Sequence, residues 1–334
     1  MKLEILPVYG IGDVAPGDDL AALIARAAPW LADGDVLVVT SKIVSKAEGR
    51  LVDVPVDGPL RAAAREEVLI SETARPVARR GQTRIVQTHH GFVMASAGID
   101  ASNVDRSRLV LLPKDPDASA RSLRATLRER HGVDVAVVVS DTMGRPWRNG
   151  LTDVALGAAG IGAIRDHRGE VDPYGNELQI TQMAVVDELA GAGELVKGKC
   201  DQVPVAVVRG YLTAPTVDDG PGVTVLVRAA DSDLFALGTA EATAAGLRAA
   251  ATLRDGDNAE IEEGAVARAL ATAGVPATFD GDTVVAEPAG ASPADLVRFG
   301  ADVHRLRAAL AAEGVATTLR LELESSRPHA VLRL

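Results

Sequence analysis

The sequence has few of the features that mark secreted or membrane-bound proteins. It contains one cysteine, Cys200, so an internal disulfide framework is excluded. It also has no apolar run near the ~18 residues of a membrane-spanning helix, and its opening residues do not form a charged-then-apolar leader. We therefore expect a cytoplasmic protein without a membrane partner.

A concentrated basic region is also lacking. The formal net charge is −11, and Lys and Arg are scattered along the chain instead of forming one block. Such a charge repels a nucleic-acid backbone, so we expect no nucleic-acid partner. A local group of cations or a bound metal ion could still reverse the potential inside one cleft, which leaves an anionic small molecule as a candidate ligand.

Small aliphatic residues supply the expected core, because hydrophobic residues make up 47% of the chain and aromatic residues only 3%. Apolar spacing predicts a first helix that Asp18 or Asp19 caps and that Gly34 follows. Two more helices are expected over residues 119–130 and 180–196. Strands are expected over residues 36–40, 133–139 and 204–210. The irregular order of these elements favours an α+β (mixed α/β) fold.

An Ala-rich helix around residues 240–258 ends in a polar turn and marks the best domain boundary. We predict one domain over residues 1–250 and a short α+β domain over residues 251–334. No catalytic arrangement of residues is visible in the second.

Two glycine-rich segments resemble nucleotide-binding loops without their context. In "GELVKGKC", residues 193–200, a helix precedes the glycines and a strand follows, whereas a phosphate-binding loop joins a strand to a helix. In "YGIGDVAPG", residues 9–17, Ala15 stands where a dinucleotide-binding loop has its third glycine. The second segment could still bind a ligand as a plain loop.

The segment "VVTSKIVSKAEGR", residues 38–50, places polar side chains at the end of a buried strand. If a helix follows Thr40, Lys42 and Lys46 lie one turn apart on one face. With the hydroxyls of Ser41 and Ser45 and the free N–H groups of the helix start, this face would suit a phosphate. The alternative is an ordinary capped and solvated helix start.

Two carboxylates are expected at strand ends. Asp100 lies in "SAGIDASNVD" and Asp141 in "VVVSDTMGRPWRNGLTD", residues 137–153. With the neutral oxygens of Thr142 and Asn103 they supply the hard ligands that Mg²⁺ or Mn²⁺ takes. Local turn formation is the alternative for these polar residues.

Arginines follow the second carboxylate. We expect Arg145 and Arg148 to hold anions through paired hydrogen bonds, and Trp147 to pack the turn that directs them. The alternative is that both arginines are ordinary surface residues.

Two further segments contain residue types that could belong to a site. His89 and His90 do not favour zinc, because the chain has one cysteine and no second spaced pair of histidines. The segment "GEVDPYGNELQIT", residues 169–181, could form a wall of the site or a simple tight turn.

Several of these segments together resemble one family. The stretches "SKIVSKAEG", "AGIDASN", "SDTMGRPWRNGLTDVALGAAG", "DPYGNEL" and "VPVAVVRG" occur in the order typical of the coenzyme F420:L-glutamate ligase family. These GTP-dependent enzymes attach glutamate to a deazaflavin cofactor precursor. The resemblance covers about residues 3–250. It implies a family-specific α+β fold of two intertwined lobes, with a small C-terminal appendage here, and a homodimer whose groove holds the site.

The resemblance also implies roles for single residues. It implies one divalent metal ion on Asp100 and Asp141 and a second on Thr142, as Mg²⁺ or Mn²⁺, with K⁺ as a further candidate. Arg145 and Arg148 match arginines of the family, and from their chemistry we expect them to act as anion clamps, with Asp141 as the third catalytic residue. The guanine nucleotide would contact Ile11, Gly12, Asp13, Val14, Ser41, Lys46 and Asn103.

The expected reaction joins L-glutamate to the deazaflavin precursor through an acyl phosphate and releases GDP and phosphate. FMN is not expected, because longer relatives bind flavin in a larger nitroreductase-like domain that residues 251–334 are too short to form. The alternatives are a metal-dependent nucleotide phosphohydrolase, a non-catalytic GTP-binding module, and a sister ligase that joins glutamate to another carboxylate.

Overall fold

The structure is a computed structural model that describes residues 2–199, 201–212, 218–322 and 328–334. Cys200 lies outside these ranges. The chain divides into two compact units, Met1–Ala236 and Leu237–Leu334. The boundary expected at residue 250 falls within helix α6 (Thr239–Ala251) of the second unit.

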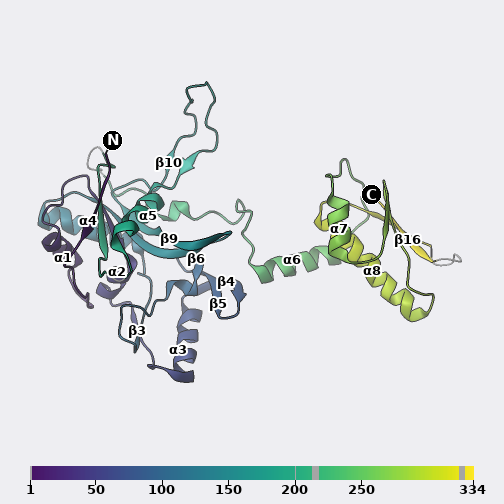
Figure 1. The fold of residues 1–334 in the computed structure, drawn as a ribbon, viewed down its shortest axis with the longest axis horizontal. Coiled ribbons are helices and arrows are strands. Elements are labelled where there is room, and N and C mark those ends of the chain that lie inside the picture. Colours follow the sequence, from purple (N-terminus) through teal and green to yellow (C-terminus); the bar gives the residue numbers. More distant parts are fainter. Residues whose placement is uncertain (1, 200, 213–217, 323–327) are drawn as a thin grey trace. The chain divides into compact units, whose positions relative to one another are not determined.

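A five-stranded sheet forms the centre of the first unit (Figure 1). Its central neighbours β2 and β8 run parallel, and the other neighbouring pairs run antiparallel. This arrangement confirms the mixed α+β class. In spatial order the strands are β1 (Glu4–Val8), β12 (Val205–Arg209), β2 (Val36–Thr40), β8 (Ala136–Arg145) and β9 (Arg148–Ala159).

Helices cover both faces of this sheet. Leu37 and Val39 of β2 point to the face covered by α1 (Leu20–Ala27) and α4 (Pro116–His131). Val36 and Val38 point to the opposite face, which α5 (Val185–Lys197) covers. Because side chains alternate along a strand, burial on both faces requires the continuous apolar run that β2 has.

Some of the predicted helix starts and ends are confirmed, whereas α1 ends at Ala27, well before Gly34, and α4 begins at Pro116 instead of residue 119. Asp19 caps α1, where its Oδ1 accepts a hydrogen bond from the backbone N–H of Ala22 at 3.0 Å. Gly132 ends α4 with a φ of 68°, in the left-handed region that glycine tolerates. The helix expected from residue 180 begins only at Val185, because Gln182 and Met183 form strand β11.

The predicted end of the strand before Asp141 is wrong. Strand β8 continues to Arg145 and forms a long hairpin with β9, in which Pro146 and Trp147 make the two-residue turn. Asp141 therefore lies within the strand, where its neighbour on β9 is Val154.

Smaller elements complete the first unit. A pair of short strands, β10 and β11, begins and ends an arm that projects from the unit (Figure 1). The bounds are α2 (Ser41–Ala47), β3 (Leu51–Asp53), α3 (Gly58–Ser71), β4 (Thr73–Arg80), β5 (Thr83–Thr88), β6 (Val93–Ala95), η1 (Ser96–Gly98), β7 (Arg108–Val110), β10 (Arg165–Asp166), β11 (Gln182–Met183) and η2 (Thr224–Leu226).

The second unit has a core of its own, in which Val284, Leu306 and Leu332 are fully buried. Its sheet is antiparallel throughout. The sheet order is β13 (Thr278–Asp280), β14 (Thr283–Ala286), β16 (His329–Arg333) and β15 (Thr318–Glu322), and the remaining helices are α7 (Ala265–Ala273) and α8 (Pro293–Ala312). Within the described ranges, no helix combines the length and the apolar composition that crossing a membrane requires.

Candidate functional site

A small pocket in the first unit brings separate predicted segments together. The start of α2 contributes Ser41, Lys42 and Ser45, the segment after η1 contributes Asp100, and β8 contributes Asp141. The parallel pairing of β2 with β8 explains this meeting, because it places Thr40 beside Ser140 and so brings the residues that follow them to the same edge.

One of the two carboxylates in the pocket is paired with a lysine. Lys42 Nζ lies 2.6 Å from Asp100 Oδ2 and donates to the hydroxyl of Ser102 at 2.8 Å. Burial would raise the pKa of Asp100, but the hydrogen bonds from Lys42 and from the backbone N–H of Ser102 outweigh it and hold that pKa below its ordinary value. Asp100 is therefore ionised at neutral pH.

The other carboxylate has no such partner. In the part of the chain that the structure describes, no Lys or Arg forms an ion pair with Asp141. Burial, together with the negative charges of Asp153 and Asp100, raises its pKa to about 6, against a hydrogen bond from the Thr142 backbone N–H. A cation beside Asp141 would relieve this accumulated negative charge.

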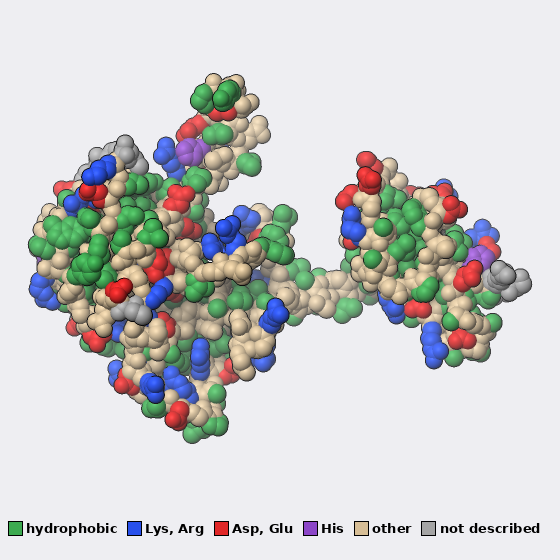
Figure 2. Space-filling model, viewed as in Figure 1, with side chains coloured by type: hydrophobic (Ala, Val, Ile, Leu, Met, Phe, Trp, Pro, Cys, Tyr) green, Lys and Arg blue, Asp and Glu red, His purple; other side chains and the backbone are tan. Residues whose placement is uncertain are grey.

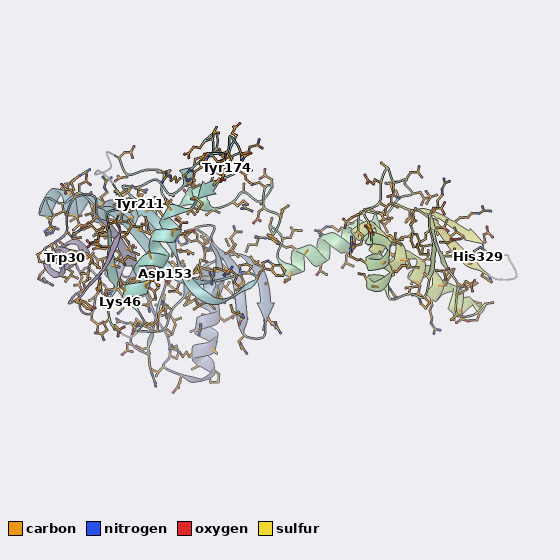
Figure 3. All side chains as sticks on the ribbon, turned by 45° about the horizontal axis from the view of Figure 1, so that its top comes forward. Trp30, Lys46, Asp153, Tyr174, Tyr211 and His329 are labelled. Carbon is orange, nitrogen blue, oxygen red and sulfur yellow. The ribbon has the colours of Figure 1, made fainter. Side chains whose placement is uncertain are left out.

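Behind Thr142 lies a buried ionic cluster that sequence reasoning missed. The side chains of Asp153 on β9, which Figure 3 labels, and of Lys197 on α5 are 2% and 3% exposed. Lys197 Nζ lies 2.9 Å from Asp153 Oδ2. Thr142 Oγ1 donates to Asp153 Oδ1 at 2.6 Å. A signal was available, since Lys197 continues the buried face of α5 formed by Leu189 and Gly193.

A second lysine lies on the outer side of Thr142. Lys199 Nζ donates to Thr142 Oγ1 at 2.7 Å and also pairs with Glu194. The predicted metal ligand Thr142 is thus held between an ammonium group and a carboxylate.

The predicted nucleotide loop is placed beside α2. Ile11 and Val14 are buried in the core, so their side chains are not available to a ligand, whereas Gly12 and Asp13 are exposed. Lys46 Nζ lies 3.6 Å from Asp13 Oδ1. Any nucleotide contact at Ile11 and Val14 would therefore use backbone atoms.

Other predicted residues lie outside the pocket. Asn103 is exposed in the turn after Asp100, with a φ of 53°. Arg145 and Arg148 are exposed at the hairpin end, where Arg145 donates to the Asn149 carbonyl at 3.4 Å. Because β8 continues beyond Asp141, Arg145 lies four residues, or roughly 13 Å, along the strand from it.

The prediction that Trp147 packs the turn is wrong. Its side chain is 90% exposed, and its ring lies 6.5 Å from that of Phe235. The hairpin extends the turn away from the core, so the indole has little to pack against.

The segments left open by the sequence are not part of the pocket. Asp172 caps its own turn in the arm, accepting hydrogen bonds from the backbone N–H groups of Tyr174 and Asn176. His89 and His90 lie in the turn between β5 and β6, and His90 Nε2 lies 2.9 Å from the Pro113 carbonyl oxygen.

The donor set fits a metal ion that also binds phosphate. Within the described ranges, no group of three or more His, Cys, Asp and Glu side chains is arranged to hold a metal ion. Asp100 and Asp141 nevertheless supply two carboxylates to one pocket. Mg²⁺ is commonly bound by one or two carboxylates with phosphate oxygens and water as its other ligands. The pocket therefore suits a nucleotide-bound ion better than a protein-only metal cage.

Comparison with known proteins places the chain in a family. The family model described as F420-0:Gamma-glutamyl ligase matches residues 10–210. The chain belongs to this family. Three relatives named coenzyme F420:L-glutamate ligase show the same likeness. Those of Methanothermobacter thermautotrophicus and Methanopyrus kandleri are both 42% identical, over 252 and 247 residues, covering 70% of this chain and 99% and 97% of the relative. That of Haloarcula marismortui is 43% identical over 228 residues, covering 63% of this chain and 88% of the relative.

The range matched to the gamma-glutamyl ligase family includes every predicted site residue. It also includes the missed pair Asp153 and Lys197. It ends within the first unit, so the second unit, Leu237–Leu334, lies outside the matched range.

Proposed function

We propose that this chain ligates L-glutamate to the deazaflavin precursor of coenzyme F420, using GTP and divalent metal ions and forming GDP and phosphate. The observation that carries the proposal is the pocket in which Asp100 and Asp141 meet the polar start of α2. Family membership supports the ligase chemistry, and the two carboxylates support a metal-bound phosphate at this place.

The proposed reaction has two steps. A carboxylate oxygen of the precursor attacks the γ-phosphorus of GTP, forming an acyl phosphate and releasing GDP. The amine of glutamate, having lost a proton, then attacks the acyl carbon, and the C–O bond to phosphate breaks as the amide forms. GTP supplies the leaving group that a free carboxylate lacks.

Because the reactants are anions, the site has to offset their mutual repulsion. Mg²⁺ or Mn²⁺ on Asp100 and Asp141, with a second ion on Thr142, would screen the charge of the phosphates. Lys46, whose Nζ lies 3.6 Å from Asp13 Oδ1, would contact a nucleotide bound at the Gly12–Asp13 loop. Arg145 and Arg148, at the exposed hairpin end, would hold a substrate carboxylate or phosphate.

The test is incorporation of labelled glutamate. Purified protein with GTP, Mg²⁺ and the precursor should yield a labelled deazaflavin, and Asp141→Asn should lower the rate on the order of 100-fold or more while remaining folded. Asp280→Asn is a matched control, since Asp280 is exposed on β13 of the second unit, outside the pocket and the arm. No label from folded wild-type protein would refute ligation. GTP hydrolysis at the same rate with and without glutamate and precursor would favour the phosphohydrolase. GTP binding without any turnover would favour the GTP-binding module.

We also propose that the active form is a homodimer. The projecting arm carries Val171, Tyr174 and Ile180, which are 64%, 91% and 89% exposed, and hydrophobic side chains are visible at its end in Figure 2. An exposed apolar group of this kind favours burial against another surface. Light scattering should give twice the chain mass for wild type, and Tyr174→Asp with Ile180→Asp should shift it toward the monomer. A monomeric wild type would refute the proposal.

A further inference from the structure

The buried lysine behind the pocket is held by defined contacts. Lys197 Nζ donates to Asp153 Oδ2 and to Ser140 Oγ, both at 2.9 Å, and lies 3.3 Å from Glu194 Oε2. Burying an ammonium group is costly unless it is paired and hydrogen-bonded. These contacts offset the cost of burying the Lys197 ammonium group and at the same time fix the carboxylate of Asp153.

The carboxylate of Asp153 is fully engaged by donors from the chain. Its Oδ2 accepts from Lys197 and from Ser140, the latter at 2.9 Å, and its Oδ1 accepts from Thr142 at 2.6 Å. Burial would raise the pKa of Asp153, but Lys197 and these hydrogen bonds lower it overall, so it remains ionised. A carboxylate with three chain donors orients its neighbours and has little capacity left for a ligand.

The contacts of Thr142 determine where its hydroxyl proton points. An ammonium group has donors and no acceptor, so Thr142 Oγ1 accepts the hydrogen bond from Lys199. The hydroxyl has one proton, and that proton therefore goes to Asp153 Oδ1. The outer side of the Thr142 oxygen therefore carries its lone pairs, which face the ammonium group of Lys199.

We propose that Asp153, fixed by Lys197, is a positioning residue that keeps the Thr142 hydroxyl turned with its proton inward and its oxygen available to a divalent cation. Lys199 takes one of the two lone pairs of this oxygen in the structure, which leaves the other for the divalent cation. The inference rests on the proposed function, because the cation is the metal ion assigned there to Thr142.

The test measures cation binding without turnover. Mn²⁺ is titrated into the protein with GDP present, and free Mn²⁺ is followed by electron paramagnetic resonance. Asp153→Asn keeps the shape of the side chain and removes its charge. It should weaken Mn²⁺ binding about 10- to 100-fold, as changes behind a metal ligand commonly do. Unchanged affinity in this variant would overturn the proposal.

A double-mutant cycle separates positioning from a general structural effect. Thr142→Val removes the oxygen through which Asp153 is proposed to act, so Asp153→Asn should cause no further loss in that background. Thr142→Ser keeps the hydroxyl and should bind Mn²⁺ like wild type. Fully additive losses from Thr142→Val and Asp153→Asn would show that Asp153 acts by another route and would overturn the inference.

Control measurements distinguish failure of the inference from a folding defect and from failure of the proposed function. Asp134 Oδ1 lies 2.9 Å from Nη2 of the buried Arg124, away from the pocket. Asp134→Asn removes this carboxylate and should leave the Mn²⁺ affinity unchanged. If Asp153→Asn does not fold, Ser140→Ala replaces it, since it removes one donor from the same carboxylate. Unchanged affinity in Ser140→Ala would then overturn the proposal. Wild-type protein that binds Mn²⁺ in this way but transfers no glutamate would refute the proposed function and leave the inference standing.

Discussion

Lys42 Nζ lies 2.6 Å from Asp100 Oδ2, whereas Asp141, which lines the same pocket, has no lysine or arginine paired with it in the described ranges. The two carboxylates consequently differ in charge behaviour. The pKa of Asp100 is held below its ordinary value, and burial raises that of Asp141 to about 6. The negative charge near Asp141 is therefore the part of the pocket that a bound cation would compensate.

The raised pKa of Asp141 predicts a loss of stability as pH rises. Well below pH 4, the carboxyl is protonated in the folded and unfolded chains alike. Between that pH and about 6, the unfolded chain loses the proton while the folded chain keeps it, so the free energy of unfolding falls as the pH rises. Asp141→Asn lacks this fall and should gain up to about 3 kcal/mol relative to wild type between pH 4 and pH 8.

Urea unfolding with a chelator present, at both pH values, measures this difference. The chelator matters because a bound metal ion would favour the ionised form of Asp141. Identical pH dependence in wild type and Asp141→Asn would mean that Asp141 titrates as an ordinary carboxyl.

The buried pair of Lys197 and Asp153 predicts a large effect from a single change. Lys197→Met leaves the carboxylate of Asp153 buried without its cation, which should lower the free energy of unfolding by about 3–5 kcal/mol. Adding Asp153→Leu removes the unpaired charge and should restore much of that loss, because an apolar pair can replace a buried ion pair. Denaturant titration of both variants tests this, and a double variant less stable than Lys197→Met would contradict it.

Local sequence patterns predicted the elements that depend on near neighbours. Asp19 caps α1 through a residue three positions away, and Gly132 ends α4 through its own backbone freedom. The start of α2 directly after β2 was likewise predictable. These features need little information from distant parts of the chain.

The network around Thr142 depends on distant partners and could not be predicted in the same way. The hairpin register shifts by one residue between Val139 and Ser140, and this shift places Asp153 opposite Thr142. Without it, Thr142 would face Val154. Lys197 completes the network from α5, 44 positions from Asp153 along the chain. The polar residues after Ser140 suggested a strand end because their pairing with β9 was not visible in the local pattern.

A close backbone approach at Gly157 predicts sensitivity to one added methyl group. A Cβ on Gly157 would lie 2.2 Å from the backbone carbonyl of Pro116 at the start of α4. Gly157→Ala should therefore destabilise the protein by at least about 1–3 kcal/mol, because the added methyl group fits only if the start of α4 shifts away from β9. Gly162→Ala is the matched control, because its nearest neighbour would be 3.7 Å away. Thermal unfolding compares the two, and equal melting temperatures would contradict the packing between β9 and α4.

The backbone conformation of Trp147 in the hairpin turn predicts that glycine is a more stable replacement there than alanine. Trp147 has a φ of 63°, in the left-handed region that costs a non-glycine residue roughly 1–2 kcal/mol, and its exposed ring gains little from burial. Trp147→Gly should be more stable than Trp147→Ala by about 1 kcal/mol, because both lose the ring contact with Phe235 but only glycine relieves the backbone.

Thermal unfolding of both variants measures this difference, and glutamate transfer measured alongside shows whether the indole has a use that offsets its conformational cost. If Trp147→Gly is more stable than Trp147→Ala but transfers glutamate more slowly than wild type, the strained turn serves to present the indole between Arg145 and Arg148. If Trp147→Gly is no more stable than Trp147→Ala, the positive φ carries no cost at this turn, and the exposed position of the ring needs no functional explanation.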